Sequence, residues 1–141
     1  MKSNSIREQF GPYSVFHLNA QSIGTTQHEI EYIVQANNSK FIAITENWKS
    51  ANQLPAYWIP GYKLVSSFCR REKKHGGAVV YCLGDVECSA REDLTELSVP
   101  YLFECAGTEV AIDKNIFVVL SIYCPSTPNY NTFREAEFDS R

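Results

Sequence analysis

The sequence lacks any long apolar stretch, and several classes of protein are thereby excluded. No segment of its 141 residues approaches the roughly 18 uncharged apolar residues of a membrane-spanning helix. Glycine and proline are scarce, at 7 and 6 residues, which excludes a fibrous or low-complexity chain. Neither sign of charge dominates, because 13 basic and 16 acidic residues leave a net charge of −3, so no overall positive field attracts nucleic acid. A hydrophobic share of 44% over this length indicates one globular domain.

The first residues also lack the apolar centre of a secretion signal, since Arg7, Glu8 and Gln9 occupy that position. We therefore expect an intracellular protein, in the nucleus or the cytoplasm. The cysteines are odd in number and form no Cys-x-x-Cys pair, which favours reduced, buried thiols over a zinc site or a disulfide framework. They are Cys69, Cys82, Cys88, Cys105 and Cys124.

The N-terminal third has the pattern strand, helix, strand. Residues 13–18 alternate in polarity and predict a strand. Thr26 and Glu29 form a capping-box pattern, from which an amphipathic helix is expected to run to residues 37–38. The apolar run at 41–45 then predicts a strand that is buried on both faces and parallel to the first.

The remaining segments predict two antiparallel hairpins. Their strands are expected at residues 62–68, 78–83, 102–112 and 116–123. A loop is expected at 51–60, and a charged tip at 70–75 joins the first strand pair. In the second pair, Asn115 is suited to a positive φ in the turn. Residues 133–138 have the pattern of a helix start.

Polar side chains stand where three of the predicted strands end: Asn19, Glu46 and Tyr123. Ligands commonly bind at the C-terminal ends of the strands in an α/β sheet. An amide oxygen and a carboxylate are oxygen ligands suited to Mg²⁺, and a tyrosine can donate to a phosphate oxygen. Taken singly, each residue also fits an ordinary role, as a turn cap, a solvated loop residue or an interface aromatic.

Five short motifs give this constellation a wider context. They are HLNAQS at 17–22, ITENW at 44–48, GY at 61–62, GGAVVY at 76–81 and IYCP at 122–125. In order and spacing the chain resembles the endonuclease/exonuclease/phosphatase superfamily, and most of all the apurinic-like endonuclease domain of non-LTR (LINE-type, jockey-like) retrotransposons. The resemblance extends from Val15 to about Phe138. We interpret residues 1–12 as an N-terminal arm and 13–141 as a partial domain.

The resemblance implies a fold and an activity. The fold is the N-terminal part of a four-layer α/β sandwich of mixed, mostly antiparallel sheets, here truncated. The activity is Mg²⁺-dependent cleavage of phosphodiesters, with Mn²⁺ as an alternative metal, for DNA nicking beside a reverse transcriptase. Asn19 and Glu46 match the family's metal-site residues, and Tyr123 matches its phosphate-contacting tyrosine. DNA is the implied partner, and no membrane is involved.

The charged tip offers candidate DNA contacts, with a solvated loop as the alternative. Its basic residues are Arg70, Arg71, Lys73 and Lys74. Binding through them would weaken as salt rises.

The sequence departs from the family in two motifs, Gly-Asp-x-Asn and Ser-Asp-His, which it does not contain. Those motifs supply the residues that orient the phosphate and activate water. Weak or absent cleavage is therefore expected, and His17 is the one histidine predicted to lie near the site. We also expect an open sheet face, covered by a second copy or by a partner that supplies the missing half. Two alternatives stay open: a non-catalytic nucleic-acid-binding or protein-interaction fragment, and an enzyme acting on a phosphoinositide or another phosphate ester.

Overall fold

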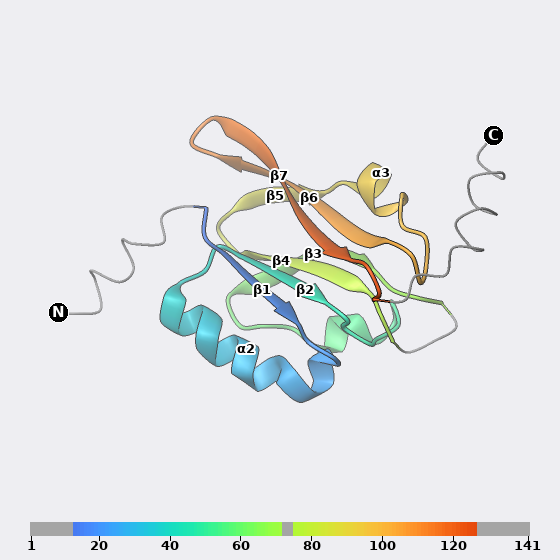
Figure 1. Ribbon diagram of the computed structural model, residues 1–141. Helices are drawn as coiled ribbons and strands as arrows, with labels where there is room; N and C mark the ends of the chain where they lie inside the picture. The colour runs from blue at the N-terminus through green and yellow to red at the C-terminus, as the bar shows by residue number, and fades with distance from the viewer. Residues whose placement is uncertain (1–12, 72–74, 127–141) are drawn as a thin grey trace.

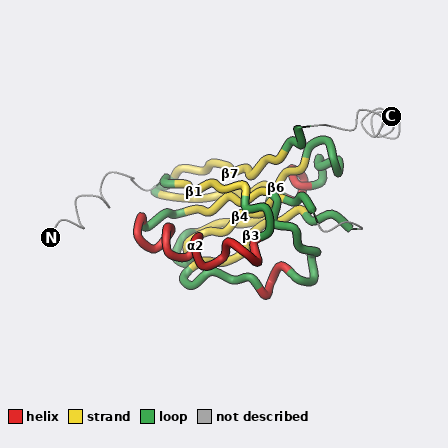
Figure 2. The backbone as a smooth tube through the Cα atoms, turned by 60° about the horizontal axis from the view of Figure 1, so that its bottom comes forward, coloured by secondary structure: helices red, strands yellow, loops and turns green. Residues whose placement is uncertain are grey.

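The structure, a computed structural model, describes residues 13–71 and 75–126. Two β-sheets pack face to face, and the long helix covers the outer face of the first (Figures 1 and 2). The strand order is β1-β2-β4-β3 in the first sheet and β5-β6-β7 in the second. The elements are β1 (Val15–Asn19), α2 (Ile23–Asn37), β2 (Phe41–Thr45), the 3₁₀ turn η1 (Leu54–Ala56), β3 (Tyr62–Phe68), β4 (Ala78–Leu83), β5 (Glu87–Ala90), α3 (Glu92–Thr95), β6 (Glu104–Ile112) and β7 (Asn115–Tyr123).

The central strand β2 is buried along its whole length, as predicted. It pairs in parallel with β1, from Val15 opposite Phe41 to Asn19 opposite Thr45, and antiparallel with β4 on its other side. Parallel strands require a crossover, which α2 supplies on the outer face. This arrangement places the C-terminal ends of β1 and β2 at one edge of the sheet.

Side chains that alternate along β2 and β4 divide the interior into two cores. The core under α2 contains Ile30, Val34, Ile42, Ile44, Val79 and Tyr81. The core between the two sheets contains Phe41, Val80, Cys82, Ala106, Val110 and Val119. The second core fixes the second sheet over the first, so that residues distant in sequence meet at the same end of the sandwich.

Two predicted details of the elements are wrong. The helix begins at Ile23 with Ser22 as its N-cap, and the Thr26 hydroxyl donates to the Ser22 carbonyl at 3.1 Å, so Thr26 lies in the first turn. The second hairpin turns at Asp113 and Lys114, with φ of 50° and 67°, because the two-residue turn whose central residues are both left-handed, type I′, matches the strand twist. Asn115 instead begins β7.

Other predictions for the elements have mixed outcomes. The helix ends as predicted, with Asn38 in the left-handed conformation at φ 53°. Both antiparallel hairpins are present. The short elements β5 and α3 were not anticipated from the sequence. The helix start expected at 133–138 lies outside the described residues.

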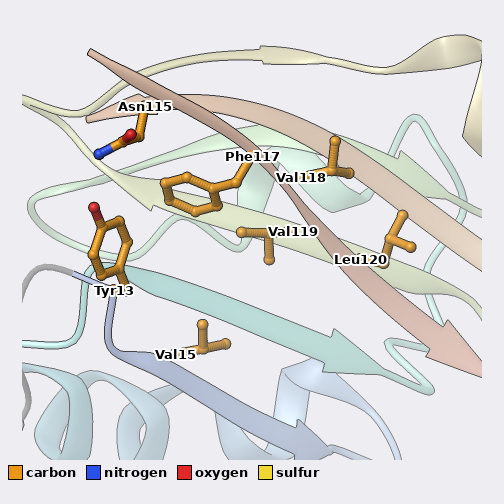
Figure 3. Close-up of a pocket in the computed structure, with 7 residues that line it drawn as sticks. All are labelled: Tyr13, Val15, Asn115, Phe117, Val118, Val119 and Leu120. Carbon is orange, nitrogen blue, oxygen red and sulfur yellow. The ribbon is translucent and has the colours of Figure 1, made fainter. Parts of the chain in front are cut away.

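The outer face of the second sheet is largely apolar and exposed along β7. Helix α3, one turn long, packs against β6 and forms the only part of a fourth layer within residues 13–71 and 75–126. Alternate β7 side chains face outward and are not covered by any residue that the structure describes, namely Ile116, Val118, Leu120 and Ile122. Beside the free edge of β7, a groove of about 580 Å³ extends to Tyr13 and Val15 (Figure 3).

Within the described part of the chain, no helix is long and apolar enough to cross a membrane.

Candidate metal and phosphate site

Asn19 and Glu46 lie at the same edge of the first sheet. Asn19 ends β1 and pairs with Thr45, the residue before Glu46. Beyond the strands, the Ala20 amide donates to the Thr45 carbonyl at 2.9 Å, and the Ser22 amide donates to the Glu46 carbonyl at 3.0 Å. These bonds continue the parallel pairing past the strand ends, so both polar side chains are presented at one edge. Asn19 is exposed and Glu46 is half-buried.

The second sheet contributes Tyr123 to this edge. Its hydroxyl donates to Glu46 Oε1 at 2.9 Å, across 77 positions of sequence. Two residues earlier on β7, the Ser121 hydroxyl donates to the Ile44 carbonyl at 3.0 Å, which fixes this strand against β2. Partial burial, and then the bond to Glu46, raise the pKa of Tyr123. The phenol therefore stays protonated and able to donate over a wide pH range.

The backbone that carries Glu46 has an uncommon conformation. Glu46 and Trp48 have φ of 53° and 59°, in the left-handed region that residues with a side chain seldom adopt. Two hydrogen bonds hold them there: the Glu46 amide donates to the Gly77 carbonyl at 2.9 Å, and the Trp48 amide to the Gly76 carbonyl at 3.1 Å. Strain of this kind persists where the surroundings over-determine it, and it concentrates at functional sites.

Asn47 is fully buried between these two strained residues. Its Oδ1 accepts from the Lys49 amide at 2.8 Å, whereas its Nδ2 has no hydrogen-bond partner in the described chain. A Cβ added to Gly77 would lie 2.4 Å from that Nδ2 atom. The side chain of Asn47 therefore packs directly against the backbone of Gly77. This packing fixes the loop that carries Glu46 and leaves Asn47 Nδ2 without a hydrogen-bond partner among the described residues.

Arg70, predicted to contact DNA, is buried instead. Its Nε and Nη2 donate to Glu104 Oε2 at 2.8 and 2.6 Å, and its guanidinium lies 4.1 Å from the centre of the Tyr101 ring. This ion pair occupies the guanidinium inside the protein, so it is not presented to a ligand. Arg71 is exposed, and Lys73 and Lys74 lie outside the described residues.

The histidines do not gather at the site. His17 is exposed on the same face of β1 as Asn19, two residues before it. His28 is on α2, with Nδ1 3.6 Å from a Glu31 carboxylate oxygen. The ring of His75 packs against Trp48 with centroids 4.3 Å apart. In sequence position, His17 is the histidine nearest to the candidate ligands.

The chemistry of the donors fits a hard divalent cation. Tyr123 donates to Oε1 of Glu46. No hydrogen bond from a described residue reaches Oε2 of Glu46 or the side-chain amide of Asn19. Within the same described ranges, no group of three or more His, Cys, Asp or Glu side chains could hold a metal. Mg²⁺ keeps several waters and commonly takes one or two protein carboxylates. One carboxylate and one amide therefore suit Mg²⁺ better than zinc, which prefers a closed set of nitrogen and sulfur ligands.

Sequence reasoning missed Glu104, the buried partner of Arg70. The one available signal was an acidic residue inside an otherwise apolar strand segment, Phe103 to Ala106. An acidic residue there implies a buried cation, but the pattern does not say which basic residue supplies it.

Comparison by sequence finds no matching protein-family model and no matching curated protein. Comparison of structures finds endonuclease domains. The chain is similar to the endonuclease domain of TRAS1, a telomere-specific non-LTR retrotransposon, with a TM-score of 0.61 and 14% identity over 92% of this chain and 54% of that one.

Two further solved structures have the same architecture. The catalytic domain of Xenopus laevis APE2 gives a TM-score of 0.59 at 14% identity, over 87% of this chain and 48% of that one. The AP endonuclease LMAP of Leishmania major gives 0.56 at 11% identity, over 90% and 46%. The chain thus has the α/β sandwich fold of the endonuclease/exonuclease/phosphatase type. It spans about half the length of the solved chains it matches.

Proposed function

We propose that the chain forms the Asn19, Glu46 and Tyr123 part of a Mg²⁺-dependent endonuclease site for DNA phosphodiesters. The observation that carries the proposal is the hydrogen bond between Tyr123 and Glu46 at 2.9 Å. It joins residues from two different sequence motifs, Glu46 at 44–48 and Tyr123 at 122–125. The two residues are 77 positions apart and are carried by different sheets. A tyrosine and a glutamate without a shared role would not be expected to form a hydrogen bond at the end of the sheet that also carries Asn19.

Each residue has a task that its environment supports. Glu46 Oε2 and the Asn19 amide oxygen would hold Mg²⁺ at the edge of the first sheet. Tyr123 orients the Glu46 carboxylate before a ligand binds, and its single O–H would have to leave Glu46 Oε1 to donate to a phosphate oxygen. A bound Mg²⁺ would polarise the phosphate and stabilise the leaving oxygen. The strained backbone at Glu46 keeps its carboxylate in place before a ligand arrives.

DNA is proposed as the substrate because two of the structural neighbours are named as an AP endonuclease and as the endonuclease domain of a retrotransposon. The net charge of −3 excludes attraction by the protein's overall field, so contact with the DNA backbone would be local. Arg71 is the described basic residue of the charged tip that faces solvent.

The residues that activate water in the family have no counterpart in the sequence. We propose that cleavage by this chain is weak, because Asn19, Glu46 and Tyr123 are assigned to binding and orientation, which leaves the activation of water without a residue. His17, on the same face of β1 as Asn19, is the residue of this chain that could accept a proton there.

The exposed β7 face favours a second candidate function, an interaction module completed by another polypeptide. Four apolar side chains project from β7 without cover from the described residues, and contiguous exposed apolar surface commonly marks an interaction site. In that case DNA cleavage by the chain alone would be absent, although the metal could still bind.

Nicking of supercoiled plasmid tests the proposal. The purified chain is incubated with Mg²⁺, with and without EDTA, beside a Glu46→Gln variant. A Glu87→Gln variant is the matched control, because Glu87 is an exposed carboxylate on β5, outside the candidate site. Metal-dependent nicking that Glu46→Gln alone abolishes would support the proposal. A folded chain that neither nicks DNA nor binds Mg²⁺ would refute it and favour the interaction module.

A further inference from the structure

The first residue of β6, Glu104, is a fully buried carboxylate. A buried charge is strongly unfavourable unless it is paired and hydrogen-bonded, and Glu104 has four donors. Its Oε2 accepts from Arg70 Nε at 2.8 Å, from Arg70 Nη2 at 2.6 Å and from the Tyr101 amide at 3.1 Å. Its Oε1 accepts from the Gly77 amide at 2.7 Å. Arg70 and Tyr101 thus fix Oε2, and Oε1 in turn fixes the amide of Gly77.

Gly77 connects Glu104 to the segment that carries Glu46. While its amide donates to Glu104, its carbonyl accepts from the Glu46 amide at 2.9 Å. Glu46 has a φ of 53°, a conformation that needs fixed neighbours to persist. The path from the Glu104 carboxylate to the Glu46 backbone therefore consists of two hydrogen bonds and one glycine.

Gly77 and its neighbour Gly76 are each packed tightly against a side chain. A Cβ on Gly77 would lie 2.4 Å from Asn47 Nδ2, and a Cβ on Gly76 would lie 2.3 Å from Arg70 Cζ. Because Arg70 packs against Gly76 and Glu104 accepts from the Gly77 amide, we expect a shift of either side chain to displace that backbone. The displacement would pass to the Glu46 amide through the Gly77 carbonyl.

We propose that Glu104, held by Arg70, is a positioning residue that sets the orientation of Glu46 in the candidate metal site. This inference rests on the proposed function, because that function assigns Glu46 to the metal. Glu104 touches neither metal nor phosphate and acts through Gly77. An ion pair that only stabilised the sandwich would leave the metal affinity of the folded protein unchanged, and this difference can be measured.

The informative substitution is Glu104→Gln. A carboxylate can accept at both oxygens, whereas an amide has one acceptor, and Glu104 has donors at both positions. Either the Arg70 guanidinium or the Gly77 amide must then face the NH₂ group of the glutamine. Because bonds to a charged guanidinium are the stronger, Arg70 should take the oxygen, and the NH₂ should oppose the Gly77 amide.

Thr108→Val provides the matched control. The Thr108 and Ser66 hydroxyls share a buried hydrogen bond of 2.7 Å between β6 and β3, the same two sheets that the ion pair connects. The substitution removes a buried polar contact between the sheets, but neither hydroxyl bonds to Gly77 or Glu46. If Glu104→Gln does not fold, Glu104→Asp replaces it, because it keeps the charge for Arg70 but is one methylene too short to reach Gly77 as well.

Two measurements on the full chain decide the question. Mn²⁺ affinity is measured by electron paramagnetic resonance, and hydrogen exchange of the Glu46 and Trp48 amides by NMR. In the Glu104 variant we expect Mn²⁺ affinity to fall about tenfold and both amides to exchange faster relative to those of β6, whereas Thr108→Val keeps wild-type values. Wild-type affinity and wild-type exchange in the Glu104 variant would overturn the inference.

The failure of the proposed function would look different. If the wild-type chain binds no Mn²⁺, the metal site itself is refuted, and the exchange measurement alone decides whether Glu104 fixes the Glu46 backbone. Faster exchange confined to Glu46 and Trp48 would still support positioning, whereas unchanged exchange would refute it.

Discussion

The hydroxyl of Tyr123 donates to Glu46 Oε1 at 2.9 Å, from the last residue of β7 to the residue that follows β2. The two sheets of the sandwich meet at the candidate site through this bond. It explains how a carboxylate at the end of a buried parallel strand is given one orientation: one oxygen is engaged by the phenol, and the other is left for a ligand. The position of Glu46 thus depends on the packing of the second sheet.

Removing that phenol should affect the site more than the fold. Tyr123→Phe deletes one half-buried hydrogen bond, worth about 1 kcal/mol of unfolding free energy, and frees the Glu46 carboxylate to rotate. We expect plasmid nicking and Mn²⁺ affinity to fall about tenfold or more. Tyr32→Phe is the control, since Tyr32 lies exposed on α2. Equal losses in both variants would contradict this assignment of Tyr123.

The elements around the site follow from local patterns in the sequence. The apolar run of β2 and the alternation in β1 specify a buried parallel pair, and that pair puts Asn19 and Glu46 at one edge. The two hairpins follow from strand patterns that flank turn residues. Each of these inferences depends on residues close to one another in sequence.

The contacts between the sheets could not be predicted in the same way. Four basic residues in the charged tip look equivalent in sequence, yet Arg70 is paired with Glu104, 34 positions away, and Arg71 faces solvent. The difference depends on which side chain meets the second sheet after packing. The left-handed conformation of Glu46 likewise arises from the bond to the Gly77 carbonyl and has no signature in the local sequence.

Alkaline pH should destabilise the protein through its buried phenols. Burial raises the pKa of Tyr81 and of Tyr62 above the ordinary value near 10, and that of Tyr123 is raised as well. A phenol whose folded-state pKa is raised stabilises the fold fully below the unfolded pKa, and this stabilisation is lost as pH rises toward the folded pKa. Burial also raises the pKa of the Cys82 thiol, and that of Cys69 to about 11, whereas an unfolded thiol ionises near pH 8.5. The unfolding free energy should therefore begin to fall above about pH 8.5, and fall more steeply above about pH 10, where the unfolded phenols also ionise.

Urea denaturation at a series of pH values tests this dependence. Tyr81→Phe should make the alkaline decline shallower, because the hydroxyl of Tyr81, which donates to the Tyr57 carbonyl at 3.0 Å, is the most strongly shifted phenol among those described. Its cost at neutral pH should be about 1 kcal/mol. An alkaline decline of the same slope in the variant would show that other groups cause it.

The exposed face of β7 should make the isolated chain associate. β7 is an edge strand of nine residues without a charged side chain, and its outward residues are apolar. Natural edge strands commonly carry charges or prolines that prevent pairing with other chains. Val118→Lys should shift the weight-average mass toward the monomer in sedimentation equilibrium, whereas Ser89→Lys on β5 should not. A wild-type chain that stays monomeric at every concentration would contradict the expectation.

Alanine substitutions at two glycines, Gly61 and Gly77, distinguish the cost of backbone strain from the cost of disrupting the tight packing that fixes Glu46. Gly61 and Gly77 both have positive φ, 83° and 95°. Alanine at either position should therefore lower the free energy of unfolding by about 1–2 kcal/mol, because a Cβ disfavours the left-handed backbone. A Cβ at Gly61 meets no atom within 4 Å, whereas at Gly77 it would lie 2.4 Å from Asn47 Nδ2. Thermal melts should therefore show a moderate decrease in Tm for Gly61→Ala and a much larger one for Gly77→Ala. Similar decreases would mean that the loop can open around Gly77, and the strained backbone of Glu46 would then not be held as rigidly as the hydrogen bonds imply.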